Sequence, residues 1–158
     1  MTTFKQFLEN ENKNIKTEII DDIKVIGDDK FIAKTKEALS SLNNSKTFNQ
    51  IKQFIGIIEQ SERSGMVFWN KPPKYQVGKS TYEANSLWYA STIAHDTYHS
   101  ALFRQGNNTN GKDAEIKCLK IQRKVLQEIN APEYMIKYID EHIVNPTYQD
   151  KNYKDRNW

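Results

Sequence analysis

Hydrophobic residues recur along this chain at two spacings, and each spacing predicts a kind of secondary structure. In 29–42 and in 45–62 they recur every three or four positions, which is the period of a helix with one apolar face. The same period returns in Pro132–Val144, where proline is a favourable first helical residue. We therefore expect an amphipathic helix in each of these segments.

Three shorter segments predict β-strands. Ile23–Ile26 is rich in β-branched residues and ends at a Gly-Asp-Asp turn signal. Met66–Trp69 and Tyr75–Val77 lie on either side of a Pro-Pro dipeptide, which indicates two strands joined by a turn. Together with the helices, these strands predict an α+β fold in which a small β-sheet packs against helices.

The stretch Trp88–Gly106 predicts a helix that is apolar almost all the way round. Leu102 lies on one side of this helix, and Ile93 and Ala101 lie on the opposite side. A helix of this kind is covered by other elements, so we expect it at the centre of the fold. Gly106 is the expected C-cap.

Two of the three histidines of the chain, His95 and His99, lie four residues apart in this central helix. At this spacing two side chains are separated by about 40° around the helix axis and point the same way. Two imidazoles in that arrangement can bind one metal ion. The alternative is a pair of core histidines whose nitrogen atoms are satisfied by hydrogen bonds.

Glu115 is the candidate for a third metal ligand. The next predicted helix, Lys112–Ile129, has one apolar face on which Glu115 and Gln122 lie, and the short connection makes the two helices neighbours. An unpaired buried carboxylate costs several kcal/mol, so Glu115 on this face needs a cation. Pairing with a lysine, or exposure in the first helical turn, is the alternative. Gln122, two turns further along, is expected to lie close to a metal ligand.

This arrangement of a two-histidine helix and a glutamate early in the next helix resembles the zincin metallopeptidases, in particular the group whose third zinc ligand is a glutamate. The resemblance covers about residues 64–130. It implies a compact zincin-like domain in which His95, His99 and Glu115 bind Zn²⁺. It also implies a peptide or protein substrate that pairs with an edge strand beside the central helix, and either strand flanking the Pro-Pro turn is a candidate.

The resemblance assigns the role of general base to Asp96, the residue after the first histidine. The family motif is HExxH, whereas this chain reads HDTYH, and aspartate is shorter than glutamate by a carbon–carbon bond of about 1.5 Å. Hydrolysis therefore depends on whether the shorter carboxylate reaches a water on the metal. His142, on the last predicted helix, is the candidate for stabilising the oxyanion, and a surface histidine is the alternative.

Three other functions fit part of this pattern. The main alternative is a zincin-like module that keeps zinc for structure or for peptide binding and does not hydrolyse peptides. A metal phosphohydrolase could use His95 and Asp96 as adjacent metal ligands. Metal sites of that type resemble a ligand set with a further histidine upstream, and no histidine precedes His95. A helical bundle that binds a metal through three histidines would use His142 in place of Glu115.

Length, charge and composition limit the number of domains and the kinds of partner that fit this chain. A chain of 158 residues, 37% of them hydrophobic, is expected to form a single domain, with 1–16 and 145–158 as peripheral segments. The net charge of +3 comes from dispersed lysines and not from a basic block, which argues against a nucleic-acid partner. No apolar run approaches the length of about 18 residues that a membrane span needs, and the N-terminus lacks a signal-peptide core, so we expect a soluble protein.

The chain contains one cysteine, Cys118, which excludes an internal disulfide. Cys118 lies on the apolar face of Lys112–Ile129. Its simplest interpretation is a core residue, and a position near the metal is the second.

Overall fold

The described strands all lie in the first half of the chain, and the longest helices follow them. The computed structural model describes residue 3 and residues 14–146, so the peripheral segments expected at 1–16 and 145–158 lie almost wholly outside it. The strands are β1 (Lys16–Ile20), β2 (Ile23–Gly27), β3 (Ile57–Gln60), β4 (Gly65–Val67) and β5 (Lys74–Val77). The helices are α2 (Asp29–Leu42), α3 (Lys46–Ile51), the 3-10 turn η1 (Lys52–Phe54), α4 (Lys79–Tyr82), α5 (Ser86–Arg104), α6 (Lys112–Glu128) and α7 (Glu133–Val144).

The strands form one mixed sheet in the order β1-β2-β3-β5-β4. Strands β2, β3 and β5 are parallel to one another, and β1 and β4 run antiparallel at the two edges. A mixed sheet combined with helices confirms the predicted α+β class. None of the helices in the described part of the chain is both long enough and apolar enough to cross a membrane.

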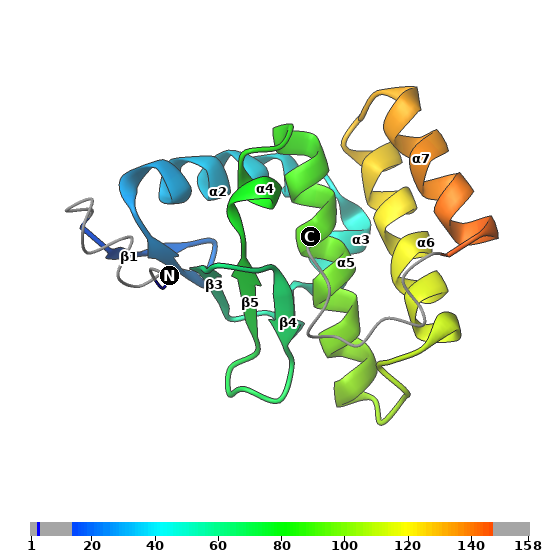
Figure 1. Ribbon diagram of the computed structural model, residues 1–158, viewed down its shortest axis with the longest axis horizontal. Coiled ribbons are helices and arrows are strands. Elements are labelled where there is room, and N and C mark those ends of the chain that lie inside the picture. Colours follow the sequence, from blue (N-terminus) through cyan, green and yellow to red (C-terminus); the bar gives the residue numbers. More distant parts are fainter. Residues whose placement is uncertain (1–2, 4–13, 147–158) are drawn as a thin grey trace.

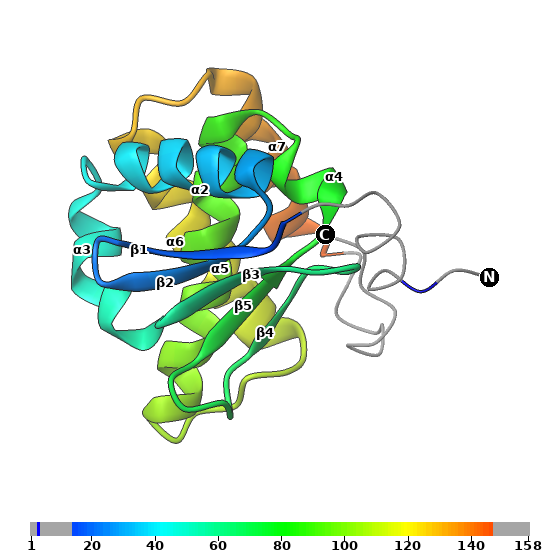
Figure 2. The ribbon, with the colours of Figure 1, turned by 90° about the vertical axis from the view of Figure 1, so that its left-hand side faces the viewer.

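One face of the sheet packs against helices. Buried and partly exposed residues alternate along β3, β4 and β5, which is the pattern of strands with one covered face. The register aligns Val25, Ile58, Tyr75 and Met66 in a single buried row across four strands. Helices α2 and α5 lie on this side of the sheet (Figure 2).

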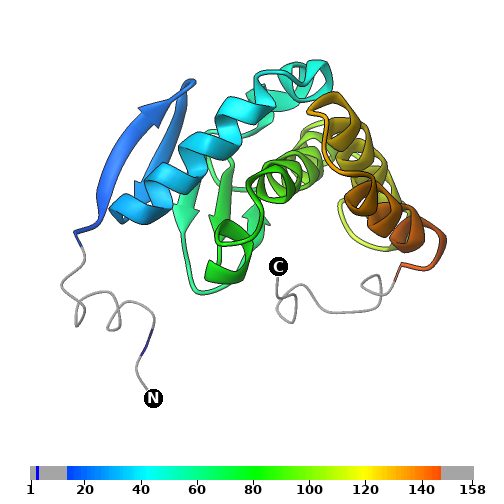
Figure 3. The ribbon, with the colours of Figure 1, turned by 90° about the horizontal axis from the view of Figure 1, so that it is seen from above.

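Helix α5 occupies the centre of the molecule, as its apolar sequence predicts. It contacts the sheet on one side and α6 on the other, and α7 packs on α6 (Figures 1 and 3). The Tyr75 hydroxyl donates a hydrogen bond to Thr92 of α5 at 3.2 Å, and the hydroxyls of Thr35 and Tyr89 lie 2.7 Å apart between α2 and α5. Burial raises the pKa of Tyr89 above its ordinary value, so this tyrosine is a neutral hydrogen-bonding group.

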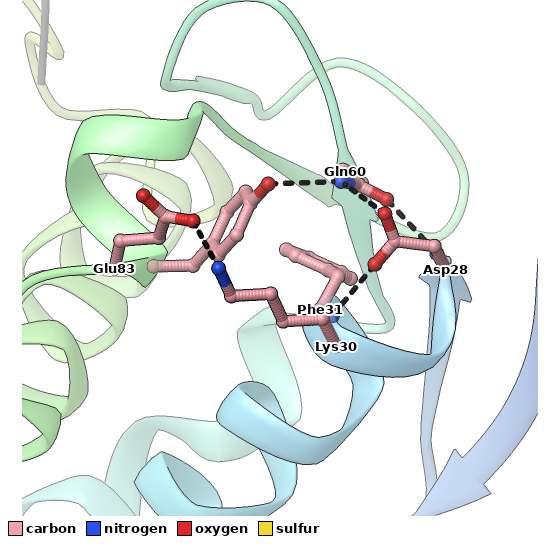
Figure 4. A network of polar contacts seen from close by, with 6 residues as sticks. Asp28, Lys30, Phe31, Gln60 and Glu83 are labelled. Atoms are coloured by element: carbon pink, nitrogen blue, oxygen red, sulfur yellow. Dashed lines mark hydrogen bonds and ion pairs between the residues drawn. The ribbon is translucent and has the colours of Figure 1, made fainter. Parts of the chain in front are cut away.

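A buried polar network holds the start of α2 against the sheet (Figure 4). Asp28 is the N-cap of α2, and its carboxylate accepts a hydrogen bond from the Phe31 amide at 2.8 Å. The Gln60 side chain accepts from the Asp28 backbone amide and donates to the Asp28 carboxylate and to the Tyr82 hydroxyl. Gln60 thereby connects β3, α2 and α4 and leaves none of its own amide atoms unsatisfied.

The single helix predicted at 45–62 is wrong. Helix α3 ends at Ile51, and after the 3-10 turn the strand β3 begins at Ile57. The isoleucines on both sides of Gly56 favour a strand, and the Gly56 carbonyl accepts a hydrogen bond from the Lys24 amide at 2.9 Å. This segment therefore fills the position between β2 and β5, although its apolar residues also fit a helical period.

The sheet is also larger than the sequence predicts. Neither β1 nor β3 was expected, and the strand predicted at Met66–Trp69 ends at Val67, with Trp69 exposed beyond it. The turn between β1 and β2 consists of Asp21 and Asp22, whose φ angles are 51° and 67°. Two consecutive positive φ angles are typical of a tight hairpin turn.

Helix α5 ends at Arg104, and Gly106 follows with a φ of 73°, which confirms the predicted glycine cap. The Gly106 amide donates to the Phe103 carbonyl at 3.1 Å, and the Asn107 amide donates to the Leu102 carbonyl at 2.9 Å. These two bonds form a Schellman motif. The motif terminates α5 and starts the connection to α6, which contributes to the site described next.

Candidate metal centre

The two histidines of the central helix lie on the face of α5 that meets α6. His95 is 5% exposed and His99 is 3% exposed, and their ring centres are 5.2 Å apart. Both rings direct Nε2 towards Glu115, which is 1% exposed in the first turn of α6. The structure thus brings together the three residues predicted as metal ligands.

Glu115 contacts both histidines at once. Its Oε1 atom lies 3.2 Å from Nε2 of His95, and its Oε2 atom lies 3.4 Å from Nε2 of His99. In a tetrahedral zinc site with ligand bonds of about 2.0–2.1 Å, two ligand atoms are about 3.3 Å apart. Neither Nε2 atom makes a hydrogen bond of good geometry with any residue of the described part of the chain. This spacing and burial suit a metal ion held by the three side chains.

The connection between α5 and α6 orients the ring of His99. Its Nδ1 atom lies 3.1 Å from the backbone carbonyl oxygen of Thr109. A carbonyl oxygen accepts and never donates, so Nδ1 carries the proton. In a neutral imidazole protonated at Nδ1 the lone pair is on Nε2, the atom that faces Glu115. His99 is therefore held in the tautomer that a metal requires.

A chain of hydrogen bonds orients His95 in the same way. The Ser91 hydroxyl donates to the Trp88 carbonyl oxygen at 2.7 Å and accepts from the Gln122 side-chain nitrogen at 3.0 Å. The remaining amide atom of Gln122, Oε1, lies 2.9 Å from Nδ1 of His95 and accepts its proton. The expectation that Gln122 lies beside a ligand is confirmed, and the lone pair of His95 is again on Nε2.

Without a metal, the Glu115 carboxylate and the neighbouring imidazoles stabilise each other's charged forms. Burial alone lowers the pKa of His95, but the neighbouring Glu115 carboxylate outweighs this effect and raises the pKa above the ordinary histidine value. Burial alone raises the pKa of Glu115, but His95 and His99 outweigh it and bring the pKa far below the usual range. A metal ion bound here would replace a proton as the partner of the carboxylate.

Asp96, the predicted general base, is 3% exposed and lines a cavity of about 190 Å³ beside the two helices. His95 and Glu115 line the same cavity, and Trp88 and Tyr138 form part of its apolar wall. The negative charge of Asp96 adds to that of Glu115 in raising the pKa of His95. The proposed base, one histidine and the glutamate therefore share one cavity that can admit water and a small part of a substrate.

His142 reaches this cavity from α7. Its Nδ1 atom lies 2.8 Å from the Tyr138 carbonyl oxygen and donates to it, and the two side-chain rings are 4.1 Å apart. Glu115, by contrast, contacts the Nε2 atoms of both histidines on α5. This arrangement favours Glu115 over His142 as the third ligand and leaves His142 at the side of the cavity.

The sequence interpretation ranked Cys118 first as a core residue. Cys118 is completely buried, and its Sγ atom lies within 4.8 Å of ring nitrogens of His95 and His99, which also lie within that distance of each other. Cys118 follows Glu115 by one helical turn, and this spacing indicates that the thiol lies on the same face of α6 as Glu115. Ser91 is a site residue that the sequence did not predict.

Comparison of the chain with protein-family models, curated proteins and solved structures gives no match. The interpretation of the site therefore depends on the chemistry and geometry of this chain.

Proposed function

We propose that this protein is a zinc-dependent metallopeptidase of the zincin-like type. The observation that carries the proposal is the convergence of His95, His99 and Glu115, with oxygen–nitrogen distances of 3.2 and 3.4 Å. Both imidazoles donate their Nδ1 protons elsewhere, so both offer a lone pair at Nε2. Zinc would polarise the scissile carbonyl and lower the pKa of a bound water towards about 7. Three protein ligands leave one tetrahedral position open for such a water.

Asp96 is the proposed general base. It is buried at the wall of the cavity that His95 and Glu115 also line, so its carboxylate can accept a proton from a water within that cavity. His142 lines the same cavity from α7 and is the proposed donor to the negatively charged oxygen of the tetrahedral intermediate. Trp88 and Tyr138 form part of the apolar wall of this cavity.

The proposed substrate is an extended peptide that pairs with β4. This strand is at the edge of the sheet, bonded to β5 on one side, and no other described strand pairs with it. It packs against α5, the helix that carries His95 and His99, whereas the cavity itself is lined by residues of α4, α5, α6 and α7. A peptide that adds to this edge would bind through its backbone, with little demand on its sequence.

The second candidate function is a zinc-binding module that binds peptides or proteins without hydrolysing them. The observation that favours it is Asp96 itself, because its side chain is about 1.5 Å shorter than the glutamate of the family motif. The ligand set and the fold are the same in both functions. The two differ in whether Asp96 removes a proton from water.

Metal content tests the ligand set. Elemental analysis of the purified protein is expected to give about one zinc per chain, with strong loss in His95→Ala and in Glu115→Ala. His142→Ala is the matched control and should keep its zinc. Full zinc retention in Glu115→Ala, or loss in His142→Ala, would contradict this ligand set.

Digestion of a peptide library then separates the two functions. The protein is expected to cleave peptides, and Asp96→Asn should lower the rate by at least about 100-fold while zinc remains bound. Asp96→Glu restores the usual side-chain length and should raise the rate. If neither the protein nor Asp96→Glu cleaves any peptide while both contain zinc, the binding module is the correct function.

A further inference from the structure

Cys118 lies on α6, one helical turn after Glu115, and is completely buried. It packs with Leu102 and Ala114 at the end of the α5–α6 interface. Its Sγ atom and one ring nitrogen from each of His95 and His99 lie within 4.8 Å of one another. The same two histidines that contact Glu115 are thus also close to a thiol.

A small movement would bring this sulfur into a metal site. With a zinc–sulfur bond of about 2.3 Å and a zinc–nitrogen bond of about 2.0–2.1 Å, sulfur and nitrogen are about 3.5 Å apart in a tetrahedral site. From a nitrogen at the 4.8 Å limit, the Sγ atom therefore needs to approach by about 1.3 Å. Rotation about the single side-chain torsion of cysteine supplies a movement of this size.

We propose that Cys118 is a fourth protein ligand of the metal and regulates access of water to it. This inference rests on the metal site of the proposed function. Four protein ligands make a closed tetrahedral site, whereas three leave a position open for water. With the sulfur bound the centre is closed, and the proposed action of Asp96 on a water requires the sulfur to leave.

Cobalt(II) is the probe for this ligand. A thiolate bound to cobalt(II) gives a strong charge-transfer absorption in the near ultraviolet, which imidazole and carboxylate ligands do not give. Because the chain contains one cysteine, such a band reports Cys118 alone. The cobalt-loaded full-length protein is expected to show the band, and Cys118→Ala and Cys118→Ser should lack it. Lys120→Ala, on the exposed side of the same helix, is the matched control and should keep it.

The spectrum of the unmodified protein decides the proposal even if a cysteine variant fails to fold. Visible cobalt absorption without the charge-transfer band would overturn the role of Cys118 and leave the three-ligand site of the proposed function intact. Failure to bind cobalt at all would contradict the metal centre itself.

Hydrolysis measures the consequence of closure. If the centre is closed by sulfur, Cys118→Ala should bind zinc at least about 10-fold more weakly and should cleave peptides at least about 10-fold faster. The charge-transfer band together with unchanged hydrolysis in Cys118→Ala would contradict the regulatory role. The band together with no hydrolysis in any variant would keep Cys118 as a ligand and count against the peptidase.

Discussion

The direction of the hydrogen bonds around His95 follows from one atom that can only accept, the Trp88 carbonyl oxygen. It takes the Ser91 proton, so Ser91 must accept from the Gln122 amide, and the Gln122 oxygen must accept from His95. Each step leaves a single choice for the next. Trp88, two turns before His95 on α5, therefore determines which nitrogen of His95 can bind a metal.

Loss of Gln122 is expected to weaken zinc binding without removing a ligand. Gln122→Ala deletes the acceptor of the His95 Nδ1 proton, so the ring loses its preferred tautomer and orientation, and the zinc dissociation constant should rise by about 10- to 100-fold. Competition with a chromophoric chelator measures the constant. Gln127→Ala, on the exposed face of the same helix, is the control. An unchanged constant in Gln122→Ala would show that His95 is oriented by other contacts.

The sequence predicted the proximity of His95, His99, Glu115 and Gln122 because all of them follow from helical spacing and one short connection. Ser91 was not predicted, because its partner Gln122 is on a different helix and the pairing depends on the distance between the two helix axes. Residue spacing along one helix can be read from a sequence. The relative rotation of two packed helices is known only once their side chains are placed.

At the scale of elements, α6 also contributes to stability through its other end. Glu128, its last residue, accepts hydrogen bonds from the Ser45 hydroxyl at 2.7 Å, the Thr47 amide at 3.0 Å and the Thr47 hydroxyl at 2.9 Å. Burial raises the pKa of Glu128, but these hydrogen bonds outweigh burial and bring the pKa below the ordinary glutamate value. The charged carboxylate thus holds the start of α3 against α6.

The stabilisation by Glu128 is expected to depend on pH. Because its pKa is lower in the folded protein, the contribution is complete above the unfolded value of about 4.3 and disappears as the pH falls through the folded value. Glu128→Gln should therefore lower the free energy of unfolding by about 1 kcal/mol at neutral pH and by less at an acidic pH below about 4.3. Urea unfolding measures both values. Glu141→Gln, exposed on α7, is the control, and a pH-independent loss in Glu128→Gln would contradict this role.

The long helices were predicted closely because a single apolar face repeats over many turns, as in α2 and α6. The structure of segment 45–62 was not predicted correctly, because its isoleucines fit a helical period and are also the β-branched residues that strands prefer. Its place between β2 and β5 is decided by backbone hydrogen bonds to distant segments. The hairpin turn of Asp21 and Asp22 escaped prediction because it lacks the glycine that usually marks such turns.

At the scale of the whole molecule, the candidate site lies on the side of α5 away from the sheet. The sheet and α2 pack on one side of α5, and α6 carries Glu115 on the other (Figures 1 and 3). His95, His99 and Glu115 are buried polar groups at the interface of α5 and α6, which also contains the hydrogen bond between Gln122 and Ser91. A metal bound by all three would connect α5 to α6 and stabilise the folded chain, because the unfolded chain holds no such site.

Zinc is therefore expected to raise the melting temperature. At a free zinc concentration about 1,000 times the dissociation constant, binding stabilises the folded state by about 4 kcal/mol, which corresponds to about 8–16 °C for a chain of this length. Scanning calorimetry with zinc and after chelation measures the shift. Glu115→Ala should lose most of it, because it removes the charged ligand that contacts both imidazoles, whereas Glu141→Ala should keep it. An equal shift in the protein and in Glu115→Ala would mean that zinc stabilises this fold from another site.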